Sequence, residues 1–294
     1  MKKIEILIIG HICIDHNTSE KSSYISAGGS AIFINKIFNQ FKDCKTTVIA
    51  SYGKDFLPYL NKIKIFPARS MYNHTLIYKN IIKNELRVQK TLYRKNASPI
   101  KIKNKVGNII KQADILFIAP LLPNFSPKYI QQIVSFTKKK SVKILLPQGY
   151  FRNFNSQNNV TKREFLEANK VLPLLNFIIV SEEDFPQMRK VGHAWVRKNN
   201  NTVIITLGKK GALIINKNKE INIPTIPVAA NKIVDSIGSG DIFSAGFAYK
   251  YMKTKNIKTA VKFANKLAYK HLFYSSNEIK SISSPYNFPS TRFC

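Results

Sequence analysis

The stretch Val234–Met252, VDSIGSGDIFSAGFAYKYM, places Asp235 and Asp241 on either side of a glycine-rich turn that leads into a segment of helical spacing. Gly238 and Gly240 adopt positive φ at low cost, so the backbone N–H groups of this turn can converge on one point. They would stand at the positive end of a helix dipole, which binds phosphate well. The turn therefore predicts an anion site beside carboxylates. The alternative is that Asp241 is an ordinary helix N-cap and the glycines only form a turn.

The elements around this turn predict an α/β protein. Phe243, Phe247 and Tyr251 recur at i, i+4 and i+8 with small residues between them, which indicates a helix packed closely on a sheet. Short β-branched runs predict buried parallel strands: IEILIIG, TTVIASYG, ADILFIAP, VKILLPQG, NFIIVSE and TVIITLG. Helix-like segments lie between them: Ser30–Phe41, SPKYIQQIVSFTKKK, TKREFLEANKVLPLL and EEDFPQMRKVG. This alternation predicts a sheet covered on both faces, with its ligand site at the carboxyl ends of the strands.

Two segments, residues 13–27 and 71–95, alternate polar and apolar residues without a helical period. Such alternation is typical of strands with one wet face. We expect the two segments to form a small β-sheet lid over the strand ends, inserted in a single domain that spans residues 1–294. Residues 275–294 have a loop-like composition from which no role can be inferred.

The formal net charge of +31 raises the hypothesis of a basic nucleic-acid-binding protein. However, the basic residues are mostly lysines scattered among many Asn and Ile, and arginine-rich stripes, aromatic RNA-binding motifs and Cys/His fingers are absent. Codons rich in A and T would give this Lys/Asn/Ile mixture without selection for a partner. We therefore expect no specific nucleic-acid partner, and nucleic-acid binding stays the third hypothesis.

Cysteine usage and the first residues favour a cytoplasmic protein. Cys13, Cys44 and Cys294 are far apart and odd in number, which suggests neither a disulfide framework nor a zinc site and fits a reducing compartment. The start MKKIEILIIGHICIDHN is interrupted by Glu5 and His11 and lacks a small-residue cleavage site, so it reads as a buried strand rather than a signal peptide. No run is long enough to span a membrane, and no membrane partner is expected.

Motifs along nearly the whole chain stand in one order: GHICID, AGGSAIFIN, SYGKDF, LLPQGYFR, IITLGKKGALI and DSIGSGD. This series resembles the PfkB, or ribokinase-like, carbohydrate kinase family. The last motif is the specific one, because it is similar to the family's Asp-Thr-x-Gly-Ala-Gly-Asp with conservative changes at Ser236 and Ser239. The resemblance implies a ribokinase-like three-layer α/β/α sandwich with a mostly parallel central sheet and a small β-sheet lid. It also implies transfer of the γ-phosphoryl group of ATP to a hydroxyl of a sugar, cyclitol or nucleoside.

The resemblance also implies roles in the turn. The amides of Gly238, Ser239 and Gly240 would hold charge developing on the transferred phosphoryl group, and Asp241 would accept the proton of the substrate hydroxyl. Phosphoryl transfer needs such a proton acceptor and preorganised donors. Asp235 would steady the turn or help to bind a monovalent cation, for which potassium is the candidate; the alternative is a plain turn-capping Asp.

The acceptor side is implied by AGGSAIFINKIF, which matches the family's amino-terminal Gly-Gly signature. Gly28 and Gly29 would let the substrate approach the backbone closely. Phe33 replaces the usual Asn, and the lost polar contact disfavours ribose or fructose phosphates. Asp15 matches an early aspartate that grips substrate hydroxyls; the alternative is a turn former at a strand end. With YGKDF, these residues look most like the myo-inositol-kinase-like branch.

The nucleotide side is implied by TLGKKGALI, which resembles the family's Thr-x-Gly-x-x-Gly turn beside ATP. Thr206, Gly208 and Gly211 are carried over on this match. Asn265, within KFANKLA, matches an Asn near the adenine; the alternative is a helix-surface amide.

Magnesium is expected because it must neutralise the phosphates. The family's Asn-x-x-Glu motif, which acts on magnesium through water, is altered here to SEED, with Glu183 and Asp184 as the remaining candidates. This change predicts a reduced magnesium affinity.

The sequence thus predicts a kinase whose partners are ATP and a small-molecule substrate, with a homodimer through the lid as one expected arrangement. The second hypothesis is a degenerate family member that binds nucleotide or sugar without turnover. Phe33 and the altered SEED motif favour that rival, whereas the intact Gly-Ser-Gly-Asp turn favours an enzyme.

Overall fold

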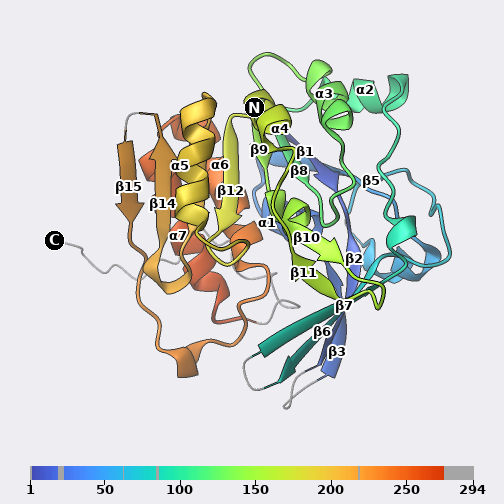
Figure 1. Ribbon diagram of the computed structural model, residues 1–294. Coiled ribbons are helices and arrows are strands. Elements are labelled where there is room, and N and C mark those ends of the chain that lie inside the picture. Colours follow the sequence, from blue (N-terminus) through green and yellow to red (C-terminus); the bar gives the residue numbers. More distant parts are fainter. Residues whose placement is uncertain (1, 19–22, 62, 84–85, 218, 275–294) are drawn as a thin grey trace.

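The computed structural model describes residues 2–18, 23–61, 63–83, 86–217 and 219–274 (Figure 1). In this part of the chain, the six apolar runs predicted as strands lie in one central sheet of order β15-β14-β13-β12-β9-β8-β1-β4-β5. Its strands are β1 (Ile4–Gly10), β4 (Cys44–Ile49), β5 (Ile65–Phe66), β8 (Ile115–Ala119), β9 (Val142–Leu145), β12 (Phe177–Ser181), β13 (Thr202–Thr206), β14 (Ala212–Asn216) and β15 (Lys219–Ile223).

The sheet is parallel from β13 to β5, and β14 and β15 extend one edge in antiparallel fashion. Ile and Val dominate the parallel strands because both faces of such a sheet are buried. Since parallel strands end at one edge, the segments that follow β1, β8, β9, β12 and β13 meet there. The functional motifs of the sequence follow these strands, so the fold gathers them on one side of the molecule.

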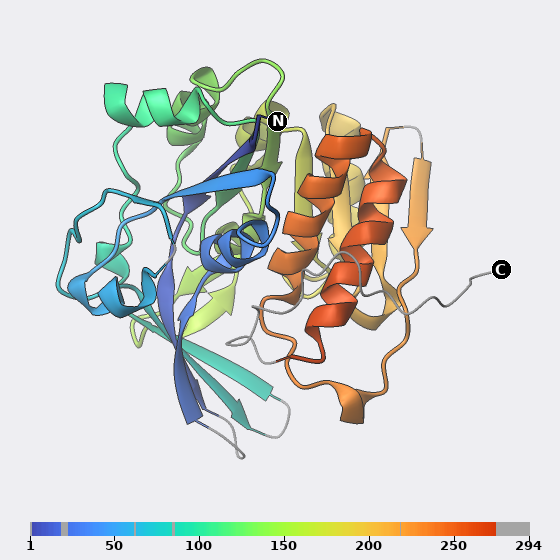
Figure 2. The same cartoon turned by 180° about the vertical axis from the view of Figure 1, so that it is seen from behind.

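Helices cover both faces of the sheet. One face packs on α1 (Ser30–Phe38), α6 (Ser239–Thr254) and α7 (Ile257–His271), seen in Figure 2. The other face packs on α2 (Asn104–Ile110), α3 (Pro127–Ser135), α4 (Ala168–Val171) and α5 (Met188–Lys198), seen in Figure 1. Alternate strand residues serve the two cores: Ile8 and Phe117 face the first layer, whereas Leu7 and Leu116 face the second. The predicted three-layer α/β/α sandwich is confirmed.

The predicted lid is a second sheet of order β3-β2-β6-β7 that projects beyond the strand ends (Figure 1). Its strands are β2 (Cys13–Thr18), β3 (Ser23–Gly28), β6 (Ile77–Lys83) and β7 (Leu86–Leu92), so it matches residues 13–27 and the later part of 71–95. The alternation has the expected meaning: Asp15 and Tyr78 line a cavity, whereas Ile25, Ile81 and Val88 are exposed.

Short elements complete the connections. A hairpin of β10 (Arg152–Phe154) and β11 (Val160–Lys162) lies beside the lid, where Thr91 N donates to Asn158 O over 3.0 Å. The 3₁₀ turns are η1 (Lys54–Tyr59), η2 (Arg94–Asn96), η3 (Pro147–Phe151), η4 (Leu172–Leu174), η5 (Gly208–Lys210) and η6 (Ala230–Lys232). This hairpin and η3 determine where Arg152 enters the site.

Some helix predictions were wrong in extent. TKREFLEANKVLPLL was expected to be one helix, but its start pairs as β11 and α4 ends at Val171, two residues before Pro173. Proline lacks the N–H that a continuing helix needs. EEDFPQMRKVG was expected to be helical throughout, but α5 begins only at Met188, because Asp184 closes a turn onto the Ser181 N–H over 2.9 Å. Helix α2 was not predicted.

The extent of the chain adds two points. No helix among the described residues is long and apolar enough to cross a membrane. The prediction that residues 1–294 form a single domain stays a prediction, because residues 275–294 lie outside the described residues.

The packing of α6 on the sheet generates a stability prediction. Phe247 is fully buried and its ring lies edge-on to Phe177 at a centroid distance of 4.9 Å. Phe247→Ala should lower the free energy of unfolding by about 3–5 kcal/mol, measured by urea denaturation. The matched control Leu166→Ala, at a side chain 70% exposed, should change it by less than about 0.5 kcal/mol. Equal effects of the two substitutions would contradict this account of the core.

Candidate active site

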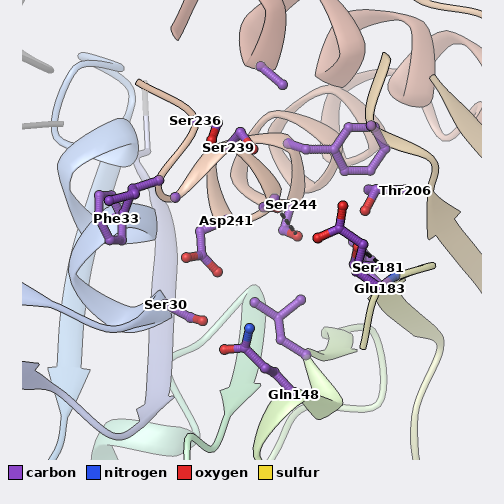
Figure 3. Close-up of a pocket in the computed structure, with 18 of the residues that line it drawn as sticks. Ser30, Phe33, Gln148, Ser181, Glu183, Thr206, Ser236, Ser239, Asp241 and Ser244 are labelled. Carbon is purple, nitrogen blue, oxygen red and sulfur yellow. Dashed lines mark hydrogen bonds between the residues drawn. The ribbon is translucent and has the colours of Figure 1, made fainter. Parts of the chain in front are cut away.

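A cavity of about 510 Å³ lies at the carboxyl ends of the central strands, between the lid and the start of α6. Side chains from distant segments line it, and Figure 3 shows Asp241, Ser30 and Gln148 pointing into it. One half is formed by the lid, α1 and η3, and the other by β12, β13 and the segment before α6. The cavity thus has the place that an open α/β sheet gives to its ligand site.

The turn predicted to bind an anion, Asp235–Asp241, lies at the start of α6 and is called the anion turn below. The helix begins at Ser239, and Gly238 is its N-cap with φ of 79°. A Cβ at Gly238 would also lie 2.5 Å from the ring of Phe33, so only glycine fits both the conformation and the space. Asp241 lies in the first turn of the helix rather than at the cap. The interpretation of Asp241 as an ordinary N-cap is therefore wrong.

The anion turn is anchored to the end of α7. His271 is fully buried, and its Nε2 lies 2.7 Å from Ile237 O. Burial lowers the pKa of His271, so the ring is neutral and donates Nε2–H to this carbonyl. Val234 N donates to Leu272 O over 2.8 Å, and Asp235 Oδ1 accepts from Ile237 N over 2.8 Å. Asp235 thus acts as a turn-capping residue, as one of the two expectations had it.

Asp241 is held in a strongly perturbed electrostatic environment. Burial raises its pKa to about 7, although the side chain keeps partial exposure to the cavity. A side-chain hydrogen bond from Ser30 lowers the pKa, Asp184 raises it, Arg152 lowers it and Asp15 raises it. A carboxylate that titrates near neutral pH can both accept and release a proton under ordinary conditions.

The lid contributes Asp15, which lies in β2 and also lines the cavity. A Cβ on Gly28 would lie 1.8 Å from Asp15 Oδ2, so the carboxylate occupies the space that glycine leaves open. Gly29 has φ of 92° and is the N-cap of α1. The Cys13 thiol donates to Asp15 Oδ1 over 3.4 Å, and burial raises the pKa of that thiol. The predicted substrate residues Asp15, Gly28 and Gly29 therefore lie together.

Phe33 both lines the cavity and packs against the anion turn. The ring is only 4% exposed and packs against Gly238, so it supports the anion turn while forming an apolar wall of the cavity. Figure 3 shows it beside the turn rather than pointing at Asp241. The replacement of a polar residue here is thus accommodated by packing.

The half of the cavity formed by β12, β13 and the segment before α6 is built on the turn after β13. Thr206 ends the strand, and Gly208 and Gly211 both have positive φ, of 54° and 96°. A Cβ on Gly211 would lie 2.2 Å from Ile223 O, which excludes larger residues. Asn265 is buried and donates to Ile223 O over 3.1 Å and to Pro224 O over 3.2 Å, so it is not a helix-surface amide.

Apolar side chains from the loop after β15 and from the end of α7 also line this cavity. They are Ile226, Val228, Ile233, Ala268, Tyr269 and Leu272. An apolar wall next to a glycine turn suits a flat, hydrophobic group such as a nucleobase.

The two candidate magnesium residues behave differently. Asp184 Oδ2 accepts from Ser181 N over 2.9 Å, and burial raises the pKa of its carboxyl, so it is engaged in the turn. Glu183 is exposed and lines the cavity (Figure 3). Among the described residues, no group of three or more His, Cys, Asp or Glu side chains could hold a metal ion.

Sequence reasoning missed Ser30, Gln148, Arg152 and His271. Gln148 and Arg152 lie in the motif LLPQGYFR, which was noted without roles for its residues. Ser30 follows the Gly-Gly pair directly, so its place in the signature was the available signal. His271 had none, because only the fold brings it under the anion turn.

The family model for pfkB carbohydrate kinases matches residues 5–276. The chain belongs to this family. Among curated relatives, the deoxyribokinase of Salmonella typhi is 30% identical over 135 residues, which cover 45% of this chain and 42% of that protein. The match therefore spans less than half of that kinase. The cytidine kinase of Thermococcus kodakarensis is 21% identical over 281 residues, covering 88% of this chain and 92% of that protein.

Solved structures show the same fold. A pyrophosphate-dependent kinase of the ribokinase family, complexed with a pyrophosphate analog and myo-inositol, superposes with a TM-score of 0.73 at 16% identity over 91% of this chain and 94% of that chain. The ribokinase of Arabidopsis thaliana, complexed with ribose and ATP, gives 0.72 at 16% identity over 94% of each chain. The predicted ribokinase-like architecture of this pfkB family member is confirmed.

The raised pKa of Asp241 generates a prediction about stability and pH. In the unfolded chain this carboxyl ionises near 3.8, whereas in the folded protein it stays protonated up to about 7. Between these values only the unfolded state releases the proton, so stability falls as the pH rises. Asp241→Asn cannot ionise and should have a higher melting temperature than the parent at pH 8, with the difference shrinking toward pH 4.

The matched control for this measurement is Asp114→Asn. Burial alone would raise the pKa of Asp114, but its hydrogen bond with Lys138 leaves the pKa lowered. Removing this carboxylate should lower the melting temperature at pH 8, the opposite sign. Calorimetry of both variants at several pH values checks the prediction, and an Asp241→Asn protein less stable than the parent at pH 8 would contradict it.

Proposed function

We propose that this chain is an ATP-dependent kinase that transfers the γ-phosphoryl group to a hydroxyl of a small polyhydroxylated molecule, namely a sugar, a cyclitol or a nucleoside. The observation that carries the proposal is the place of Asp241. Its carboxylate enters the cavity from the first turn of α6, next to the anion turn and across from Asp15 of the lid. We infer that Asp241 as proton acceptor, Asp15 as the group that binds hydroxyls and the amide donors of the anion turn act together in this cavity.

The proposed reaction is a direct transfer. Asp15 binds hydroxyls of the acceptor, and Asp241 accepts the proton of the reacting hydroxyl as its oxygen bonds to the γ-phosphorus. The bond between that phosphorus and the β,γ-bridging oxygen breaks, and ADP leaves. The amides of Gly238, Ser239 and Gly240 donate to the phosphoryl oxygens, where charge accumulates. The pKa of about 7 at Asp241 suits a general base near neutral pH.

We call the half of the cavity formed by β12, β13 and the segment before α6 the donor half. ATP is the proposed donor because apolar side chains from the loop after β15 and from the end of α7 line the cavity. Pyrophosphate has no group to fill that wall, whereas adenine has one. Thr206, Gly208 and Gly211 would border the phosphates. Magnesium, with Glu183 reaching it through water, would neutralise part of the phosphate charge. We also propose that a monovalent cation such as potassium binds near Asp235.

The outer face of the lid supports one further expectation, a homodimer through the lid. Ile25, Ile81 and Val88 are between 42% and 56% exposed there, and an exposed group of apolar side chains suits an interface. Such a dimer would bury them and leave the cavity face of each lid unchanged.

The central test of the function is Asp241→Asn. Loss of the general base should lower kcat by about 10²–10⁴, while the affinity for ATP holds, because the amides that bind phosphate stay in place. Steady-state kinetics with the best acceptor and calorimetry with ATP check this. Asp114→Asn, a carboxylate outside the cavity, serves as the control and should keep the parent's kcat. A fall of less than about tenfold would rule out Asp241 as the base, and a parent that binds ATP without turnover would support the degenerate alternative.

The identity of donor and acceptor generates a second prediction. With Phe33 in place of a polar residue, cyclitols or unphosphorylated sugars should give higher kcat/KM than sugar phosphates. With the apolar wall of the donor half, ATP should give higher kcat/KM than pyrophosphate. A coupled assay over both panels measures these ratios. Highest activity with fructose phosphates would overturn the first expectation, and highest activity with pyrophosphate would overturn the second.

A further inference from the structure

Arg152 is a cation placed among carboxylates. It begins β10, directly after η3, and its side chain lines the cavity. Its charge lowers the pKa values of both Asp184 and Asp241, so its field reaches the turn beside the donor half and the base at the anion turn. Within the described part of the chain, no carboxylate oxygen lies within 4.0 Å of a charged nitrogen of Arg152. The guanidinium therefore lies near several acids without forming an ion pair.

One edge of the guanidinium is fixed by the protein. Nη1 donates to Tyr78 Oη over 2.9 Å and to Leu121 O over 3.3 Å. The plane also stacks on the Tyr78 ring, with the guanidinium carbon 4.7 Å from the ring centroid. Tyr78 Oη itself donates to Leu121 O over 2.8 Å, which closes a three-membered arrangement. The orientation of the side chain is thus determined before any ligand binds.

The Leu121 peptide that holds Arg152 is fixed in turn. Its N–H donates to His11 Nδ1 over 2.9 Å. Burial lowers the pKa of His11 to about 3, so the ring stays neutral and keeps its acceptor lone pair. The support of Arg152 therefore persists across the physiological pH range.

The other edge of the guanidinium has donors to spare. Nε–H and the two N–H groups of Nη2 make no hydrogen bond with the residues that the structure describes. This edge has the fork geometry that matches two oxygens of a carboxylate or phosphate. A rigid fork whose side chain lines the same cavity as Asp184 and Asp241 can bind an oxyanion there.

We propose that Arg152 is a catalytic residue whose free edge binds the oxygens of the phosphoryl group during its transfer from ATP to the acceptor. This assignment rests on the proposed kinase function. The acceptor oxygen bonds to the γ-phosphorus, the bond to the bridging oxygen of ADP breaks, and the hydroxyl proton moves to Asp241. Arg152 offsets charge on the transferred group. Asp184 of the altered SEED motif is engaged in a turn, so fewer protein groups hold magnesium. More of the phosphate charge is then left for Arg152 to neutralise.

The test uses Arg152→Ala and Arg152→Lys, with Arg94→Ala as the matched control. Arg94 also stacks on an aromatic ring, that of Phe154 at 4.5 Å, and hydrogen-bonds Asn158, but it does not line the cavity. Arg152→Ala should lower kcat by about 10²–10³ with little change in acceptor KM. Added guanidinium should restore part of that kcat. Arg152→Lys should retain an intermediate rate, because it keeps the charge without the fork. Arg94→Ala should keep the parent's kcat and show no response to guanidinium.

Tyr78→Phe keeps the stacking ring and removes the hydroxyl that holds Nη1, so it should lower kcat by a smaller factor than Arg152→Ala. It also keeps the assignment testable if Arg152→Ala does not fold. A kcat of Arg152→Ala within about threefold of the parent would overturn the proposal. So would an effect confined to the KM of acidic acceptors, since Arg152 would then bind an acceptor carboxylate.

A second readout separates this proposal from the kinase function itself. Aluminium fluoride with MgADP mimics a phosphoryl group in transfer, and calorimetry measures how much it tightens ADP binding. The parent should show this gain and Arg152→Ala should lose most of it. A parent that phosphorylates no acceptor would contradict the proposed function. The role of Arg152 is still tested in that case, because loss of the gain in Arg152→Ala supports it and retention of the gain overturns it.

Discussion

The site depends on one electrostatic constraint. Several carboxylates line a single cavity, and each makes ionisation of the others less favourable. Burial is the largest cause that raises the pKa of Asp241, and Asp184 and Asp15 each raise it further. The chain offsets this repulsion with the positive end of α6, the hydroxyl of Ser30 and the charge of Arg152. The result is a carboxyl with a pKa of about 7 rather than one that stays protonated.

Two buried histidines keep the geometry fixed without adding charge. His11 supports the Leu121 peptide on the lid side, and His271 supports Ile237 in the anion turn. Burial lowers the pKa of each, so each works as a neutral imidazole. One accepts a backbone N–H and the other donates to a backbone carbonyl, as the two ring nitrogens allow. The lid side and the helix side of the cavity are thus held by the same kind of contact.

Most of the fold could be predicted from the sequence because its signals are local. Buried strands show as β-branched runs, the lid as alternation, and the anion turn as glycines before a helix. Helix extents were harder, since the pairing of Val160–Lys162 in β11 overrode the helical pattern of that segment. Within the site, Asp241 and Asp15 stand in recognisable motifs. Ser30, Arg152 and His271 act through neighbours far away in sequence, and only the folded chain shows those contacts.

The alternation in the lid has a consequence for how the acceptor site can change in evolution. Successive residues of β2 and β6 face opposite sides, so Asp15 and Tyr78 line the cavity while Ile81 faces outward. A substitution at one of these cavity-facing positions changes the lining of the cavity and leaves the outer face of the lid unchanged. An insertion or deletion of one residue in either strand would instead exchange the two faces together. Changes in what the cavity binds are therefore expected from substitutions at every second position of these strands, with strand length kept constant.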